Sequence, residues 1–179
     1  GIETTAAHFK LTPVGIDQWR SIGPAFTIIA AVFLGDFIAY WRHRLEHTRV
    51  IWPAHAIHHS DTAMTWLTLA RFHPINRLVT AGIDTAFLAL LGFPGWALVI
   101  NNLVRHYYGH FIHADLRWTY GKLAAVFVSP VMHRWHHVRI GQGVGSNFAT
   151  VFSIFDRAFG THYVPGPCDA PLGIAADHA

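Results

Sequence analysis

Histidines fall into four short groups, and this pattern restricts the possible folds more than any other feature of the sequence. The groups are HRLEH at residues 43–47, HAIHH at 55–59, HYYGHFIH at 106–113 and HRWHH at 133–137. Together they hold eleven of the chain's 15 histidines. Side chains three and four residues apart share one face of a helix, so each group presents its imidazoles together. In the pattern HxxHH the two adjacent histidines point in different directions on a helix, so they can reach two different ions. A fold that brings the four groups together therefore creates a pocket of imidazoles.

Such a pocket is suited to metal ions. Eight or more neutral imidazoles exceed the roughly four to six ligands that one ion takes, so the sequence predicts a pair of ions, and imidazole binds iron, zinc or copper. The single cysteine, Cys168, excludes an intrachain disulfide and a thiolate site. Ferritin-like sites need Glu-x-x-His on two helices. That pattern is absent, since Glu46 is the only glutamate after Glu3.

Composition and one long apolar run indicate a membrane protein. Charged residues make up 13% of the chain, against roughly 25% in an average soluble protein. From Ile22 to Trp41 the sequence is apolar except for Asp36 and a few small polar residues, and twenty helical residues span about 30 Å, the thickness of the hydrocarbon core. Arg42 and Arg44 follow this run, so the positive-inside rule places its end in the cytoplasm. The formal charge of +3 argues against a nucleic-acid partner.

A second apolar region runs from Leu78 to Val104 and is interrupted at residues 92–95, GFPG, a strong turn signal. It predicts a helical hairpin that dips into the bilayer or just crosses it. A third apolar stretch, Leu123 to Met132, is too short to span. Strand signals are weak, so an all-α fold is predicted. A soluble all-α protein with buried helices is the alternative.

We expect one domain over residues 1–179, with a lead-in at 1–20 and an irregular tail at 164–179. The chain starts at Gly1 and has no signal-peptide pattern. Either its start has been processed or the chain is a fragment.

At its histidine groups the sequence resembles the fatty acid hydroxylase / sterol desaturase superfamily of integral membrane proteins. The resemblance runs over roughly residues 36–163, through the segments DFIAYWRHRLEH, WPAHAIHHSD, RFHP, FIHADLR, SPVMHRWHH and FDRAFGTHY. It implies a helical membrane fold with a cytosolic, histidine-rich cap that holds two iron ions. It further implies O2-dependent hydroxylation, desaturation or ether cleavage of a lipid, with electrons from a separate protein such as a ferredoxin or cytochrome. A sterol, a fatty acyl chain, an ether lipid and a carotenoid are all compatible substrates.

The resemblance also implies which histidines bind metal. Eight positions match the superfamily's histidine boxes: His43, His47, His55, His58, His59, His133, His136 and His137. In the group at 106–113, His113 is the first choice and His110 the second. Six other polar residues are interpreted as further ligands, as residues that hold ligands in place, or as residues with only structural, capping or surface roles: His106, His73, His162, Asp61, Arg71 and Asp156. His8 and His178 are expected to be bystanders.

The chain departs from the superfamily pattern at two positions and at its front. Members often carry a glutamate after the RxHP motif, where this chain has Ile75-Asn76. They often carry Asn-Tyr-Gly near the end, where this chain has Asn147-Phe148-Ala149. Neither departure is expected to touch a ligand, and both are expected to bear on substrate choice. The chain is also shorter at the front than is usual, as though one or more membrane helices were missing.

Two other functions fit the same ligands. A zinc-dependent membrane hydrolase would need a nearby carboxylate base, for which Glu46 or Asp61 is available. A non-catalytic subunit of a membrane complex could retain a metal site without turnover. Iron rather than zinc is predicted from the resemblance alone.

Overall fold

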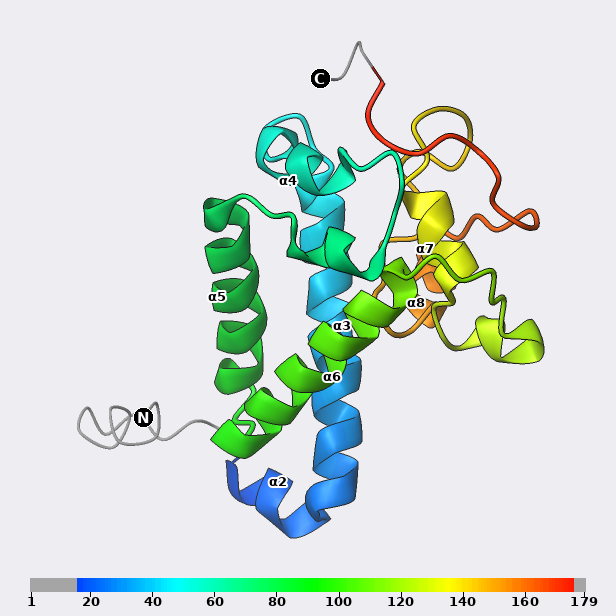
Figure 1. Ribbon diagram of the computed structural model, residues 1–179. Coiled ribbons are helices and arrows are strands. Elements are labelled where there is room, and N and C mark those ends of the chain that lie inside the picture. The colour runs from blue at the N-terminus through cyan, green and yellow to red at the C-terminus, as the bar shows by residue number, and fades with distance from the viewer. Residues whose placement is uncertain (1–15, 176–179) are drawn as a thin grey trace.

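The fold was examined in a computed structural model, which describes residues 16–175, and this range is all-helical (Figure 1). Its elements are α2 (Ile16–Ile22), α3 (Pro24–Glu46), α4 (Trp52–His59), η1 (Trp66–Ala70), α5 (Pro74–Leu90), α6 (Gly95–His113), η2 (Gly121–Ala125), α7 (Pro130–His136) and α8 (Ile154–Ala158). Residues 16–175 contain no strand, only two isolated bridges, Phe127–Phe152 and Val138–Leu172. The all-α prediction is confirmed for this range. His8, His178 and the outer parts of the lead-in and the tail lie outside it.

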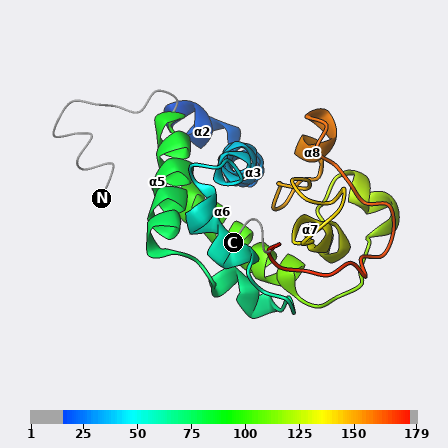
Figure 2. The same ribbon diagram turned by 90° about the horizontal axis from the view of Figure 1, so that it is seen from above.

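Helix α3 is the central element, with α5 and α6 on one side of it and α7 and α8 on the other (Figure 2). It begins at Pro24, because Gly23 has a φ of 94° that ends α2 and proline suits the first turn of a helix. It continues five residues beyond the predicted end at Trp41, since RHRLE contains no helix breaker. This extension places His43 in the last turn of α3 and His47 at its C-cap.

The predicted hairpin is present as α5 and α6. The helices are separated at residues 91–94, where Gly92 has a φ of 78° and Pro94 caps the start of α6. Both helices pack on α3. Gly35 of α3 lies so close to Asn101 of α6 that a Cβ at Gly35 would collide with the asparagine side chain. This close approach fixes the axial position of α6 relative to the histidines of α3.

The short elements α4 and α7 lie beside the C-terminal half of α3 and form the cap (Figure 1). The apolar stretch Leu123 to Met132 is not one element: it contains η2 and the start of α7. Ser129 begins α7, because its hydroxyl accepts a hydrogen bond from the backbone N–H of Met132 at 3.2 Å. The chain after Ala158, as far as residue 175, contains no helix.

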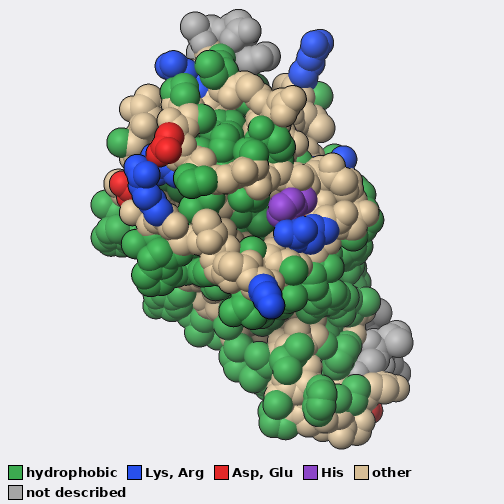
Figure 3. Space-filling model, turned by 90° about the vertical axis from the view of Figure 1, so that its right-hand side faces the viewer, with side chains coloured by type: hydrophobic (Ala, Val, Ile, Leu, Met, Phe, Trp, Pro, Cys, Tyr) green, Lys and Arg blue, Asp and Glu red, His purple; other side chains and the backbone are tan. Residues whose placement is uncertain are grey.

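Charged side chains are unevenly distributed on the surface. On the face shown in Figure 3 they gather in the upper half, around the cap, and the lower half is mostly hydrophobic. Large apolar side chains of the long helices are exposed, among them Phe26, Leu78 and Leu90. Among residues 16–175, α3 is the one helix long and apolar enough to cross a membrane. The apolar side chains of the protein therefore lie on the outer faces of helices as well as in a core.

Candidate metal centre

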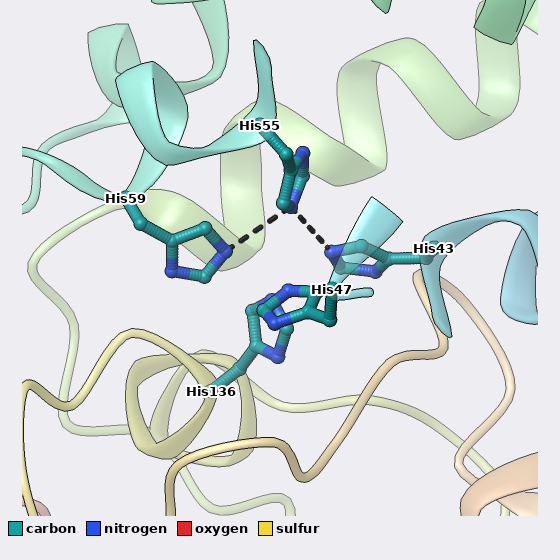
Figure 4. A group of neighbouring side chains, drawn as sticks. All are labelled: His43, His47, His55, His59 and His136. Atoms are coloured by element: carbon teal, nitrogen blue, oxygen red, sulfur yellow. Dashed lines mark hydrogen bonds between the residues drawn. The ribbon is translucent and has the colours of Figure 1, made fainter. Parts of the chain in front are cut away.

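Nine histidines from α3, α4, α6 and α7 converge in two neighbouring groups. In each group one ring nitrogen per residue lies within 4.8 Å of all the others. The first group, drawn in Figure 4, consists of His43, His47, His55, His59 and His136. The second consists of His58, His113, His133 and His137, all buried.

Each HxxHH motif contributes to both groups. In α4, His55 and His59 lie one turn apart and belong to the first group, whereas His58 belongs to the second. In α7 the assignment is reversed, since His136 joins the first group and His133 and His137 join the second. Adjacent residues on a helix point about 100° apart, so His58 and His59 diverge, as do His136 and His137. The two groups are therefore linked through short, rigid turns of helix.

Hydrogen bonds to backbone carbonyls fix the protonation of two histidines of the second group. His58 Nδ1 is 3.2 Å from the Thr68 carbonyl and His113 Nδ1 is 2.6 Å from the Gly109 carbonyl. A carbonyl oxygen only accepts, so each Nδ1 carries the hydrogen and each Nε2 of the neutral rings has a bare lone pair. These two Nε2 atoms are only 3.1 Å apart. Two lone pairs at this distance repel each other unless a cation lies between them.

The first group has the same character. His43 Nδ1 donates to the Phe148 carbonyl and His136 Nδ1 donates to the Ser146 carbonyl, each at 2.7 Å. The Nε2 atoms of His47 and His136 are buried and have no hydrogen-bond partner among residues 16–175. His55 Nε2 lies 3.1 Å from the Nε2 atoms of both His43 and His59. Acceptor nitrogens without donors are what a metal ion requires.

Burial keeps the cap histidines neutral. Desolvation lowers the pKa of His55, His58, His59, His133 and His137 well below its usual value, and neighbouring imidazoles lower it further. Burial also lowers the pKa of His136 to about 4, against the opposing effect of its hydrogen bond to Ser146. Protonation therefore does not relieve the repulsion at neutral pH. Two nitrogens bound to one ion at about 2.0–2.1 Å lie roughly 3 Å apart, which matches the observed Nε2 spacings of 2.9 to 3.3 Å. The residues fit a metal ion in each group.

Several predicted site residues lie outside both groups. His110 was the second choice in its box, but its Nδ1 is 2.7 Å from the Trp66 carbonyl, so its ring faces η1 and not the site. His106 is exposed and packs on the His110 ring. Three others are engaged elsewhere: His73 caps α5, His162 contacts Arg157, and Asp61 pairs with Arg71.

Both departures from the superfamily pattern contact the histidines, contrary to our expectation. Asn76 Nδ2 is 3.1 Å from His55 Nδ1, and the Phe148 carbonyl is the acceptor for His43. Asn76 in the first turn of α5 lies beside α4, and Phe148 lies beside the last turn of α3, so sequence distance hid both contacts. Asp156 holds that loop, because its carboxylate accepts hydrogen bonds from the backbone N–H groups of Phe148 and Ala149.

Buried charges form a network beside the first group that sequence reasoning missed. Arg42 binds Glu46 at 2.7 Å and Asp84 at 2.9 Å. Asp84 also accepts a hydrogen bond from Arg105 at 2.7 Å, and Glu46 Oε2 is 3.5 Å from His55 Nδ1. The network thus ends on a histidine of the site. The available signal was Asp84 inside an apolar run, since ionisable residues within apolar helices are rarely without a role.

A cavity of about 440 Å³ adjoins the site. Its wall includes apolar side chains such as Leu69 and Phe72, together with five histidines from the two groups: His43, His55, His58, His113 and His133. A small organic molecule in this cavity would contact the imidazoles directly.

Most of the chain is similar to one known protein family. A family model described as fatty acid hydroxylase matches residues 28–161. The chain belongs to the fatty acid hydroxylase family. The match includes all nine converging histidines. No solved structure matches the chain.

Curated relatives of this fatty acid hydroxylase family member are named as lipid enzymes. The chain is 31% identical to ornithine lipid hydroxylase OlsE of Rhizobium tropici, over 88% of its own length and 47% of the relative's. It is 32% identical to alkylglycerol monooxygenase of Homo sapiens, over 73% of its length and 29% of the relative's. It is 27% identical to very-long-chain aldehyde decarbonylase GL1-8 of Oryza sativa subsp. indica, over 72% of its own length and 48% of the relative's. The chain spans about half or less of these relatives.

Proposed function

We propose that the chain is an O2-dependent membrane oxidoreductase that hydroxylates or desaturates a lipid at a di-iron centre. The observation that carries the proposal is the pair of bare Nε2 atoms of His58 and His113, 3.1 Å apart in a buried site. The family membership and the named relatives favour oxygen chemistry on a lipid. Each histidine group would hold one ion, through His43, His47, His55, His59 and His136 in the first and His58, His113, His133 and His137 in the second.

The protein's own residues would provide ligands, orientation and a dry cavity. Bound iron supplies the activation of O2, which amino-acid side chains do not perform. The histidines remain neutral and bound, so none acts as a general base. In a hydroxylation, one oxygen atom of O2 enters a C–H bond and the other becomes water. This balance requires two electrons and two protons. We propose a separate redox protein, such as a ferredoxin or cytochrome, as the source of the electrons, and the protons come from water.

We further propose that the protein is embedded in a membrane with its cap on the cytoplasmic side. The apolar helix α3 and the exposed apolar side chains of α5 support the embedding. Arg44 and Arg49 follow the apolar part of α3, which supports the sidedness. A lipid could then enter the cavity from the bilayer.

The first test removes one histidine from each group. His58→Ala and His136→Ala should each lose metal and all lipid oxidation, because each deletes a ligand atom. The purified variants would be assayed for iron and zinc by mass spectrometry, and for incorporation of ¹⁸O from ¹⁸O2 into lipid. His162→Ala, outside both groups, is the matched control and should keep both properties. His110→Ala should keep its metal.

The outcomes separate the three possible functions. Retained metal and turnover in either ligand variant would contradict the assignment of that ligand. Zinc in the wild-type protein, with product formed without O2, would identify a hydrolase. The carboxylates available as its base are engaged, Glu46 with Arg42 and Asp61 with Arg71. Bound metal without any change in lipids, together with stable co-purification of other membrane proteins, would identify a non-catalytic subunit.

A further inference from the structure

The cavity beside the metal centre reaches the surface at a basic position. Arg77 of α5 and His106 of α6 line it along with the site histidines, and both side chains are exposed. The Arg77 guanidinium is near enough to the His106 ring for their charges to interact. The cavity therefore has an inner end of imidazoles and an outer end at Arg77 and His106.

Arg77 carries the one uncompensated charge of the cavity wall. The wall includes three arginines and two carboxylates. Arg42 and Arg105 pair with Asp84, and Arg42 also pairs with Glu46. Among the residues that the structure describes, Arg77 has no carboxylate within 4.0 Å and no side-chain hydrogen bond. A guanidinium without a counter-ion at the entrance of a cavity is suited to bind an oxyanion through paired N–H donors.

The helix itself adds to the positive potential. Arg77 lies near the start of α5, which begins at Pro74 and runs for 17 residues. The N-terminal end of a helix carries a partial positive charge from its aligned peptide dipoles. Apolar neighbours flank the arginine, since Ile75 is 60% and Leu78 is 74% exposed. A cation among exposed apolar side chains is typical of the level at which lipid head groups meet hydrocarbon.

We propose that Arg77 and His106 bind the anionic group, a carboxylate or phosphate, of the lipid whose hydrocarbon part occupies the cavity. This inference rests on the proposed function and specifies its substrate class. His106 and His113 both line the cavity and are seven residues apart on α6, so they lie about 10 Å apart along the helix axis. The anionic group is thereby held away from the metal centre, and the oxidised carbon is several bonds from it.

Binding of simple amphiphiles tests the proposal without any turnover. The metal-loaded wild-type protein in maltoside micelles would be titrated with dodecyl phosphate, dodecanoate and dodecanol, which share one chain length. We expect the two anions to bind about tenfold to a hundredfold more tightly than the alcohol, as is typical of charge-assisted hydrogen bonds. Arg77→Gln should remove this preference, and Arg77→Lys should keep part of it, because a lysine retains the charge without the paired donors.

Two controls separate the cavity from the general surface charge. Arg49→Gln also removes an exposed arginine, but one outside the cavity wall, and should leave the preference intact. Inorganic phosphate should compete much more weakly than dodecyl phosphate, because it has no chain to bury. The proposal is overturned if Arg77→Gln keeps the preference, if Arg49→Gln loses it equally, or if inorganic phosphate competes as well as the alkyl phosphate.

The same experiment distinguishes failure of this inference from failure of the proposed function. An anion preference that depends on Arg77, in a protein that oxidises no lipid, would contradict only the proposed function. Lipid oxidation by a protein without that preference would contradict only the present inference.

Discussion

At the scale of single residues, His55 shows how neighbours prepare a ligand. Its Nε2 faces the first histidine group, and its Nδ1 faces Asn76 at 3.1 Å and Glu46 at 3.5 Å. When Nε2 binds a metal ion, Nδ1 carries the hydrogen and needs an acceptor. Glu46 provides one, and rotation of the Asn76 amide would present its Oδ1, which has no partner at present.

We therefore predict that Glu46→Gln weakens metal binding. The change removes the negative charge beside His55 but keeps an oxygen for Arg42, so the affinity should fall roughly tenfold to a hundredfold. Competition with a chelator, monitored by metal release, measures this effect. Thr80→Val is the matched control, because it deletes only the 3.4 Å contact to Glu46 on the side away from His55. Equal affinity of Glu46→Gln and wild type would show that Glu46 does not orient His55.

At the scale of elements, buried ion pairs join the three long helices. Asp84 of α5 binds both Arg42 of α3 and Arg105 of α6. Asp36 of α3 accepts hydrogen bonds from the backbone N–H groups of Thr150, Val151 and Phe152 and so secures the loop that follows the Phe148 acceptor. These contacts set the axial positions of helices whose apolar faces could otherwise slide.

Removal of Asp84 should accordingly destabilise the whole bundle. Asp84→Asn weakens the compensation of buried Arg42 and half-buried Arg105. Breaking a buried pair in this way costs about 3–5 kcal/mol. Thermal unfolding in micelles, followed by circular dichroism, would show a lower midpoint. Asp17→Asn breaks the exposed pair with Arg20 at 3.7 Å and should leave the midpoint unchanged. Equal midpoints for the two variants would contradict a structural role for the network.

At the scale of the whole molecule, the histidine cluster makes the fold sensitive to acid. Burial lowers the pKa of His136 from the usual 6.5 to about 4, and lowers that of five other cap histidines as well. Below about pH 6.5 these imidazoles bind protons in the unfolded chain but stay neutral in the folded chain. The free energy of unfolding therefore falls as the pH falls. For His136 this loss of stability continues until the pH reaches its pKa in the folded protein, about 4.

We predict that the metal-free protein loses thermal stability steeply between pH 7 and pH 5. Between its pKa in the unfolded chain and its lower pKa in the folded chain, each histidine lowers the free energy of unfolding by about 1.4 kcal/mol per pH unit. Iron(II) should raise the unfolding midpoint strongly at pH 7.5 and weakly at pH 5, because protons compete for the same nitrogens. Unfolding midpoints measured across this range, with and without metal, test both statements. A metal-free midpoint that does not change with pH would contradict the burial of neutral imidazoles.

Local patterns in the sequence were sufficient for the helical class, for the break between α5 and α6, and for the histidines that could share a pocket. Helix periodicity and turn residues act over a few positions, so these features can be read without knowing the fold. The sequence also indicated that adjacent histidines in HxxHH diverge.

Only the tertiary structure decided which histidines meet and what holds them. His113 rather than His110 reaches the second group, although both lie in the last turn of α6. The His113 ring points toward His133 of α7, with their Nε2 atoms 2.9 Å apart, whereas the His110 ring points toward the Trp66 carbonyl of η1. The contacts of Asn76 with His55 and of Phe148 with His43 join residues 21 and 105 positions apart. Such contacts follow from the packing of whole helices, which no local pattern encodes. The chain thus specifies its imidazoles locally, and the packing of α3, α5 and α6 makes them one site.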